Sequence, residues 1–212
     1  MKFRVVIITL LLAPFLLSVS YAVTPSAEDV IRSTSDKVIE RLLAEQEDLK
    51  LHPGHLFDLI QELIVPHFDF PVMARYILGK SSWSSATDGQ RMAFTNQFKT
   101  LMVSTYAKAL LEYSENKIVY LSSEPAPNSR LAVVKTELTA KGSAEITPIH
   151  YRLRADSSGE WKIIDIAVDG VSLVGTYRGS FASEIRKNGL DKLIMKLAER
   201  NEKRVSSLSQ TQ

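Results

Sequence analysis

The sequence predicts an α+β protein in which a four-stranded antiparallel sheet is covered by a lobe of helices. Apolar residues recur at helical spacing over most of residues 24–113. Between residues 117 and 168 the pattern changes to short alternating runs separated by turn residues, which is typical of an antiparallel meander. Helical spacing returns after residue 172. A sheet with one apolar face needs a covering layer, and the flanking helices are the candidates for it.

The N-terminus has the features of a secretory signal peptide, which we assign to residues 1–22. Lys2 and Arg4 precede an apolar run, residues 5–17, and the small residues Ser20 and Ala22 occupy the two positions that signal peptidase reads. The run is shorter than the roughly twenty residues of a membrane-spanning helix, so we expect cleavage after Ala22 and export. Cleavage leaves 24 basic and 24 acidic residues, and this neutral balance gives no reason to expect nucleic acid as a partner.

The mature chain of about 190 residues is long enough to form one domain around its own core. It contains no cysteine, so no disulfide supports the fold and no lipid is attached through a cysteine. We assign residues 23–200 to this domain. Residues 201–212 are polar and charged with almost no apolar side chain, and we expect them to form a disordered tail.

Four helices are expected before the sheet. Each begins at a recognisable start signal: Thr24-Pro25, Pro53-Gly54, Pro71, and the capping-box spacing of Thr87 and Gln90. Pro66 is expected to end the second helix, because the residue before a proline is pushed out of the α region. Gly79 is expected to end the third and to be followed by a polar loop around Trp83.

The apolar stripe of the long fourth helix has two interpretations. Aromatic and methionine side chains recur along it from Met92 to Leu110. Core packing is the simpler explanation, because such stripes usually fill an interior. The alternative is a deformable wall of a ligand pocket.

The four expected strands are residues 118–121, 131–139, 146–154 and 161–168. In the third strand Tyr151 and Leu153 face one side and basic residues face the other. In the fourth, strict alternation places Ile164 with Ile166 on one face and Ile163 on the opposite face. Pro148 lacks a backbone N–H, so it is expected at a sheet edge or a bulge.

After the sheet, Gly170 is expected to end the last strand and Ser172 to cap a helix. Tyr177 and Phe181 are four residues apart, so their rings lie on one face of that helix. Asn188-Gly189 ends it, and residues 190–197 begin a last amphipathic helix.

Three groups of polar residues are candidates for sites of chemistry. His52, His55 and Asp58 are three apart, but Pro53-Gly54 starts a helix between the histidines, so we expect no metal site. Asp69 is expected to accept hydrogen bonds from the start of the helix that Pro71 opens.

Asp165 interrupts an apolar strand and is the best candidate for a perturbed acid, although an ion pair with an arginine such as Arg178 explains it more simply. The sequence contains no cysteine nucleophile and no G-x-S-x-G motif. We therefore expect that the protein is not an enzyme and has no cofactor.

Several segments together resemble the MlaC family, also called the toluene-tolerance auxiliary or Ttg family. They are residues 68–79 (FDFPVMARYILG), 90–113 (QRMAFTNQFKTLMVSTYAKALLEY), 147–154 (TPIHYRLR), 161–181 (WKIIDIAVDGVSLVGTYRGSF) and 188–194 (NGLDKLI). They follow one another in the family's order over residues 68–197. The resemblance implies an NTF2-like sheet and an enclosing helical lobe around an apolar pocket.

The resemblance also implies a function. Members are phospholipid carriers in the periplasm of Gram-negative bacteria. They pass lipid between an outer-membrane lipoprotein and porin complex and an inner-membrane MCE-domain ABC transporter, which maintains outer-membrane asymmetry. The bound phospholipid is cargo, and no metal or catalysis is implied.

We predict nine side chains that line the pocket. They lie on the sheet and on the helices that cover it: Tyr106, Leu110, Val134, Tyr151, Ile164, Ile166, Leu173, Tyr177 and Phe181. Two other functions remain open. One is a cone-shaped enzyme that acts on a small hydrophobic substrate with Asp165 as acid or base, and the other is an adaptor with a filled interior and no ligand.

Overall fold

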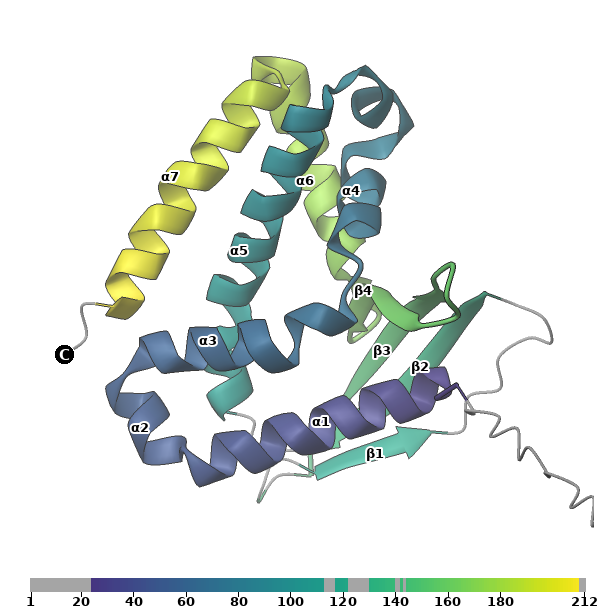
Figure 1. Ribbon diagram of the computed structural model, residues 1–212, viewed down its shortest axis with the longest axis vertical. Coiled ribbons are helices and arrows are strands. Elements are labelled where there is room, and N and C mark those ends of the chain that lie inside the picture. The colour runs from purple at the N-terminus through teal and green to yellow at the C-terminus, as the bar shows by residue number, and fades with distance from the viewer. Residues whose placement is uncertain (1–23, 113–116, 122–129, 140–141, 143, 210–212) are drawn as a thin grey trace, which may run out of the picture.

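The helices gather into a lobe beside one antiparallel sheet, as the ribbon of the computed structural model shows (Figure 1). The structure describes residues 24–112, 117–121, 130–139, 142 and 144–209. The expected signal peptide, residues 1–22, therefore lies outside the described residues. The α+β class is confirmed. None of the described helices combines the length and apolar character that a membrane crossing requires.

Six helical elements precede the sheet in the described part of the chain. They are α1 (Ala27–Ala44), α2 (Gln46–Leu51), α3 (Pro53–Leu63), the 3-10 helix η1 (Val65–His67), α4 (Phe70–Ser85) and α5 (Asp88–Glu112). The expected cap at Thr24 is wrong. Ser26 caps α1 instead, because its hydroxyl accepts the Asp29 N–H while the Asp29 carboxylate accepts the Ser26 N–H.

Helix α4 extends beyond the predicted stop at Gly79. Gly79 has the expected positive φ of 72°, but helical turns resume after it and continue to Ser85. The predicted polar loop around Trp83 is therefore wrong. Arg91 of α5 donates a 2.9 Å hydrogen bond to the Trp83 carbonyl, and this contact satisfies a carbonyl that the helix end leaves open.

The capping box at the start of α5 is confirmed. The Thr87 N–H donates to the Gln90 side-chain oxygen at 2.9 Å, and the Gln90 N–H donates to the Thr87 hydroxyl at 3.2 Å. These two bonds satisfy backbone donors that the first turn of a helix leaves unpaired. The starts of α3 at Pro53 and of α5 at Asp88 follow from local sequence alone.

The sheet has five strands rather than the predicted four. They are β1 (Lys117–Leu121), β2 (Leu131–Thr139), β3 (Ile146–Ala155), β4 (Trp161–Val168) and β5 (Val171–Ser172), in the order β1-β2-β3-β4-β5 with every neighbouring pair antiparallel. Strand β5 has only two residues, too few to give an alternating pattern. The likeness of this sheet to an NTF2-like cone remains a prediction.

Pro148 lies on the inner strand β3, so its predicted place at an edge or bulge is wrong. The β3–β4 register starts one residue later, where Ile149 pairs with Val168. The Pro148 carbonyl accepts the Asp169 N–H at 3.0 Å. Pro148 is therefore tolerated because it lies just past the end of that ladder.

A β-bulge in β4 changes which residues share a face. Leu153 pairs with Ile163 but Arg152 pairs with Asp165, so Ile164 is an extra residue in β4. Because Tyr151 and Leu153 share a face of β3, their partners Ile166 and Ile163 also share one face. The prediction that Ile166 lies on the face opposite Ile163 is therefore wrong.

Two helices follow the sheet, α6 (Leu173–Asn188) and α7 (Leu190–Ser209), with Gly189 between them at φ 81°. Helix α7 continues well past the predicted end of the domain. Asn201 is 3% exposed and donates 2.8 Å hydrogen bonds to the backbone and side-chain oxygens of Gln97. The predicted disordered tail is thus helical over residues 201–209, because a buried polar anchor holds it against α5.

Candidate functional site

One face of the sheet is apolar, and we call it the inner face. The register places Val134, Tyr151, Leu153, Ile163 and Ile166 on it. Helix α1 packs against this face, with Ala27 and Ile31 in the same buried cluster as the strand residues. Figure 1 shows α1 running alongside the sheet. We call this group the sheet cluster.

Three of the predicted lining residues form a row across the inner face. Val134 of β2 lies opposite Tyr151 of β3, which lies opposite Ile166 of β4. Val134 is completely buried, whereas Tyr151 and Ile166 are only half-buried. The described residues therefore cover the β2 end of the row more fully than the β3 and β4 positions.

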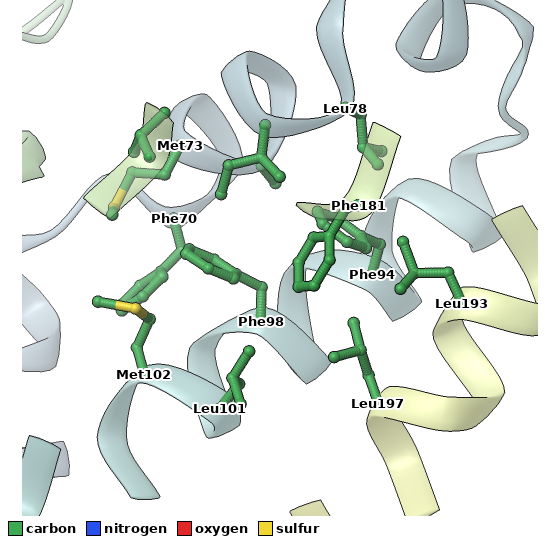
Figure 2. Close-up of a cluster of buried hydrophobic side chains, with 13 residues drawn as sticks. Phe70, Met73, Leu78, Phe94, Phe98, Leu101, Met102, Phe181, Leu193 and Leu197 are labelled. Carbon is green, nitrogen blue, oxygen red and sulfur yellow. The ribbon is translucent and has the colours of Figure 1, made fainter. Parts of the chain in front are cut away.

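Four more predicted residues belong to a separate cluster within the helical lobe. Phe181 is one of its buried members, and Tyr106, Leu173 and Tyr177 pack against it half-buried. Figure 2 shows the side chains of α4, α5, α6 and α7 that meet in this helical cluster. Rings pack edge to face at 5.9 Å between Phe94 and Phe181, so Phe181 is held on the helical side of the structure.

The last two predicted residues lie apart from both clusters. Leu110 packs half-buried against a third cluster, built mainly from α1, α2, α3 and α5, which we call the α1–α3 cluster. Ile164, the bulge residue, is 2% exposed and belongs to none of the three clusters. The structure thus unites the sheet residues in one group and the aromatic helix residues in another, with Leu110 and Ile164 outside them.

The segment that follows α3 joins the three clusters. Val65 packs against the helical cluster and the α1–α3 cluster, and Phe68 packs against the helical and sheet clusters. Phe68 forms a parallel bridge with Ile163, and the Asp69 N–H donates to the Ile163 carbonyl at 2.9 Å. The half-buried side chains of the inner face therefore lie next to this junction.

Two tyrosines among the predicted lining residues, Tyr106 and Tyr151, have a raised pKa. Burial raises the pKa of Tyr106 to about 12, with a further contribution from neighbouring Tyr177. Burial likewise raises the pKa of Tyr151 to about 12. Both hydroxyls therefore lie in apolar surroundings that disfavour the phenolate.

Asp165 is buried, 4% exposed, and its carboxylate anchors the start of α6. One oxygen accepts the Ser172 hydroxyl at 2.6 Å and the other accepts the Val174 N–H at 3.1 Å. Arg152 is its ion-pair partner, with 3.9 Å between the charged atoms. The expected ion pair with an arginine is therefore confirmed, but the partner is not Arg178, whose guanidinium lies beside Gly79 of α4.

Asp69 has the predicted capping role. Its carboxylate accepts the Val72 N–H at 3.0 Å at the start of α4. It also accepts a 2.9 Å hydrogen bond from Arg154 of β3, so the same side chain ties the helical lobe to the sheet.

His52 and His55 meet Asp48 rather than Asp58. The Nδ1 atoms of His52 and His55 lie 2.9 and 2.6 Å from the two Asp48 carboxylate oxygens. All three residues are exposed, and they form the one group of potential metal ligands among the described residues. The hydrogen bond to Asp48 is the main reason why the pKa of His55 is raised.

Two polar groups near the inner face were not predicted from the sequence. The hydroxyls of Thr34 and Tyr120 are buried and have no hydrogen-bond partner among the described residues. Tyr120 packs against the sheet cluster. Strand alternation points to the face that Tyr120 occupies, but no sequence signal identifies Thr34 of α1.

Comparisons with known proteins identify the family to which this chain belongs. A model of the MlaC protein family matches residues 32–199. This chain belongs to the MlaC family. The toluene tolerance protein ttg2D of Pseudomonas putida is 30% identical over 186 residues, which span 87% of this chain and 84% of that protein. The intermembrane phospholipid transport system binding protein MlaC of Haemophilus influenzae is 27% identical over 194 residues, 91% of this chain and 90% of the relative.

A solved structure shares the three-dimensional arrangement of this chain. It is the phospholipid-binding protein from Ralstonia solanacearum, whose structure was determined in complex with a phospholipid. The two chains are 28% identical and superpose with a TM-score of 0.77, over 85% of this chain and 99% of the Ralstonia chain. The residues that match the MlaC family thus include nearly all the described helices and the whole sheet.

Proposed function

We propose that this MlaC-family protein binds a phospholipid and carries it across the periplasm. The observation that supports this most directly is its likeness, along most of the chain, to a protein solved with a phospholipid bound. The half-buried apolar row of Tyr151 and Ile166 on the inner face gives the acyl chains a place to lie. The nine predicted lining residues remain part of this proposal.

The physical need for a carrier follows from the acyl chains. Moving one methylene group from an apolar environment into water costs about 0.8 kcal/mol, so a sixteen-carbon chain costs on the order of 12 kcal/mol. A lipid that left a membrane alone would therefore exchange very slowly. A protein that covers the chains removes most of that cost.

The proposed route runs between an outer-membrane lipoprotein and porin complex and an inner-membrane MCE-domain ABC transporter, which would maintain outer-membrane lipid asymmetry. The family membership supports it, as does the name of the Haemophilus relative, an intermembrane phospholipid transport system binding protein. The basic and apolar N-terminal segment supports export.

The contacts of Asp165 favour a carrier over the alternative enzyme. Both carboxylate oxygens accept hydrogen bonds from the start of α6, so the group is engaged in holding the helix against β4. A general acid or base must instead reach a substrate atom. We therefore give Asp165 a structural role.

Native mass spectrometry of the mature protein, purified from the periplasm without detergent, tests the proposed function. The carrier predicts a bound phospholipid at a fixed stoichiometry, which solvent extraction then identifies. A protein without lipid, even after incubation with phospholipid vesicles, would contradict the proposal and favour an adaptor without ligand.

A further inference from the structure

Two buried hydroxyl groups lack a partner beside the apolar inner face. The Thr34 hydroxyl of α1 and the Tyr120 hydroxyl of β1 have no hydrogen bond within the described part of the chain. Buried polar atoms in native proteins nearly always have a partner, so each exception needs an explanation. A ligand that accepts hydrogen bonds explains both.

Thr34 lies on α1 between residues of two different apolar clusters. One turn before it on α1, Ile31 belongs to the sheet cluster, and one turn after it, Val38 belongs to the α1–α3 cluster. Thr34 therefore lies on α1 between a residue that packs against the sheet and one that packs against the helical lobe.

Tyr120 lies on the sheet and packs beneath the same helix, α1. Its Cα pairs with Thr136, next to the Val134–Tyr151 pair, and its side chain packs against the sheet cluster. The Arg32 guanidinium of α1 lies 3.8 Å from the centre of its ring, so Tyr120 lies beneath the helix that bears Thr34.

The Tyr120 hydroxyl is a hydrogen-bond donor at neutral pH. Burial is the largest cause of its raised pKa, and nearby Ser35 partly offsets that effect without a hydrogen bond of normal geometry. The Thr136 hydroxyl has no free proton to donate to a ligand, because it already donates to the Ile149 carbonyl at 3.1 Å. Thr34 and Tyr120 thus contribute two free hydroxyl donors among the described residues.

We propose that the hydroxyls of Thr34 and Tyr120 donate hydrogen bonds to the ester carbonyl oxygens of a diacyl glycerophospholipid. This inference rests on the proposed function. Ester carbonyls accept hydrogen bonds and cannot donate them, so they match two unpaired hydroxyl donors. The attached acyl chains then extend from α1 and β1 along Tyr151 and Ile166. The site is selective for ester-linked lipids and fixes how far the chains enter.

The test compares an ester-linked phosphatidylethanolamine with its dialkyl ether analogue, which has the same head group and chain lengths. The protein is loaded from mixed vesicles that contain equal amounts of both, and native mass spectrometry measures the bound ratio. We expect the unaltered protein to favour the ester lipid by about tenfold, because two hydrogen bonds distinguish the two lipids. A ratio near one would overturn the inference.

The double variant Thr34→Val, Tyr120→Phe keeps the shapes of both side chains and removes both hydroxyls. We expect its ester-to-ether ratio to fall to about one, with no loss of thermal stability when lipid-free, because neither hydroxyl has a protein partner to lose. The matched control is Thr95→Val, Tyr76→Phe, in which one hydroxyl donates within α5 and the other residue is exposed. This control should keep the ratio of the unaltered protein.

The outcomes separate this inference from the proposed function. If the unaltered protein binds neither lipid, the proposed function fails. If it binds both lipids equally, or if the double variant keeps the full ester preference, the hydroxyl site is wrong while the carrier stands. The ratio in the unaltered protein decides the inference even if a variant does not fold.

Discussion

The Ser172 hydroxyl donates a 2.6 Å hydrogen bond to the Asp165 carboxylate, and this bond joins β4 to the start of α6. Ser172 at the same time accepts the Gly175 N–H at 2.9 Å, so one hydroxyl caps the helix and fixes the buried acid. The orientation of α6, which bears Tyr177 and Phe181, depends on this contact.

Replacing Asp165 with alanine should therefore destabilise the fold. The change leaves the Val174 N–H and the Ser172 hydroxyl without their acceptor, and hydrogen bonds to charged groups contribute most when buried. We expect a loss of about 3 kcal/mol in the free energy of unfolding, measured by urea denaturation. Glu47→Ala, at a side chain that is 85% exposed, should change it by less than about 0.5 kcal/mol. An Asp165→Ala protein as stable as the Glu47→Ala control would contradict this role.

Large side chains at the half-buried lining positions should exclude lipid. We expect Leu110→Trp combined with Ile166→Trp to reduce bound phospholipid by at least about tenfold while the protein stays folded, because both side chains are only half-buried at the edges of their clusters. Native mass spectrometry measures occupancy and circular dichroism measures folding. Val133→Trp is the matched control, since Val133 is 42% exposed on the opposite face of the sheet.

The bulge changes the choice of position on β4. Ile164 is 2% exposed, so Ile164→Trp overfills a closed site and should destabilise the protein rather than only exclude lipid. A folded double variant at Leu110 and Ile166 with unchanged lipid content would remove both residues from the lining.

The interaction of His55 with Asp48 should be visible in a pH titration. The pKa of His55 is raised by its hydrogen bond to Asp48, and the pKa of Asp48 is lowered by His55 and His52. The histidine contribution to stability is complete below its unfolded pKa of about 6.5 and is lost as pH rises through the folded value. The carboxylate contribution is complete above about 4 and is lost as pH falls through its lowered value. The pair therefore stabilises the fold most between about pH 4 and 6.5.

NMR titration of the histidine ring protons provides the measurement. In Asp48→Asn the pKa of His55 should return toward its ordinary value. His67 is the internal control, because burial lowers its pKa and Asp48 is not among the causes. An equal pKa of His55 in the unaltered protein and in Asp48→Asn would show that Asp48 does not stabilise the protonated imidazole.

The buried anchor of α7 gives a further prediction about stability. Asn201→Ala removes two hydrogen bonds to Gln97 and should lower the free energy of unfolding by about 2 kcal/mol. Glu202→Ala, one residue later and exposed, should have little effect. If both variants unfold at the same urea concentration, residues 201–209 do not contribute to the folded domain.

The sequence predicted elements whose signals are local. Proline and capping residues at Pro53 and Thr87 mark the starts of α3 and α5, because these groups act on the nearest turn of the helix. Alternation along β3 similarly placed Tyr151 and Leu153 on the inner face.

Features that depend on distant partners were missed or mistaken. The bulge at Ile164 has no sequence signal, since the pairing with β3 determines it. From the sequence alone Asn201 resembles a residue of a polar tail, because its hydrogen-bond partner Gln97 is distant in sequence, on α5. The partner of Asp165 is Arg152 on the adjacent strand rather than Arg178, because strand register brings those two together. Which side chains share a face was therefore predictable where the strand register is regular, as on β3, and not at the bulge in β4.

Photo-crosslinking with a phospholipid that bears a diazirine within one acyl chain tests the central claim most directly. After irradiation of the loaded protein, peptide mapping by mass spectrometry locates the labelled residues. We predict label on β3 and β4 around Tyr151 and Ile166 and on the end of α5 near Leu110. Label confined to exposed positions such as Met92 or Met195, with none on the inner face of the sheet, would contradict the claim that this protein encloses the acyl chains.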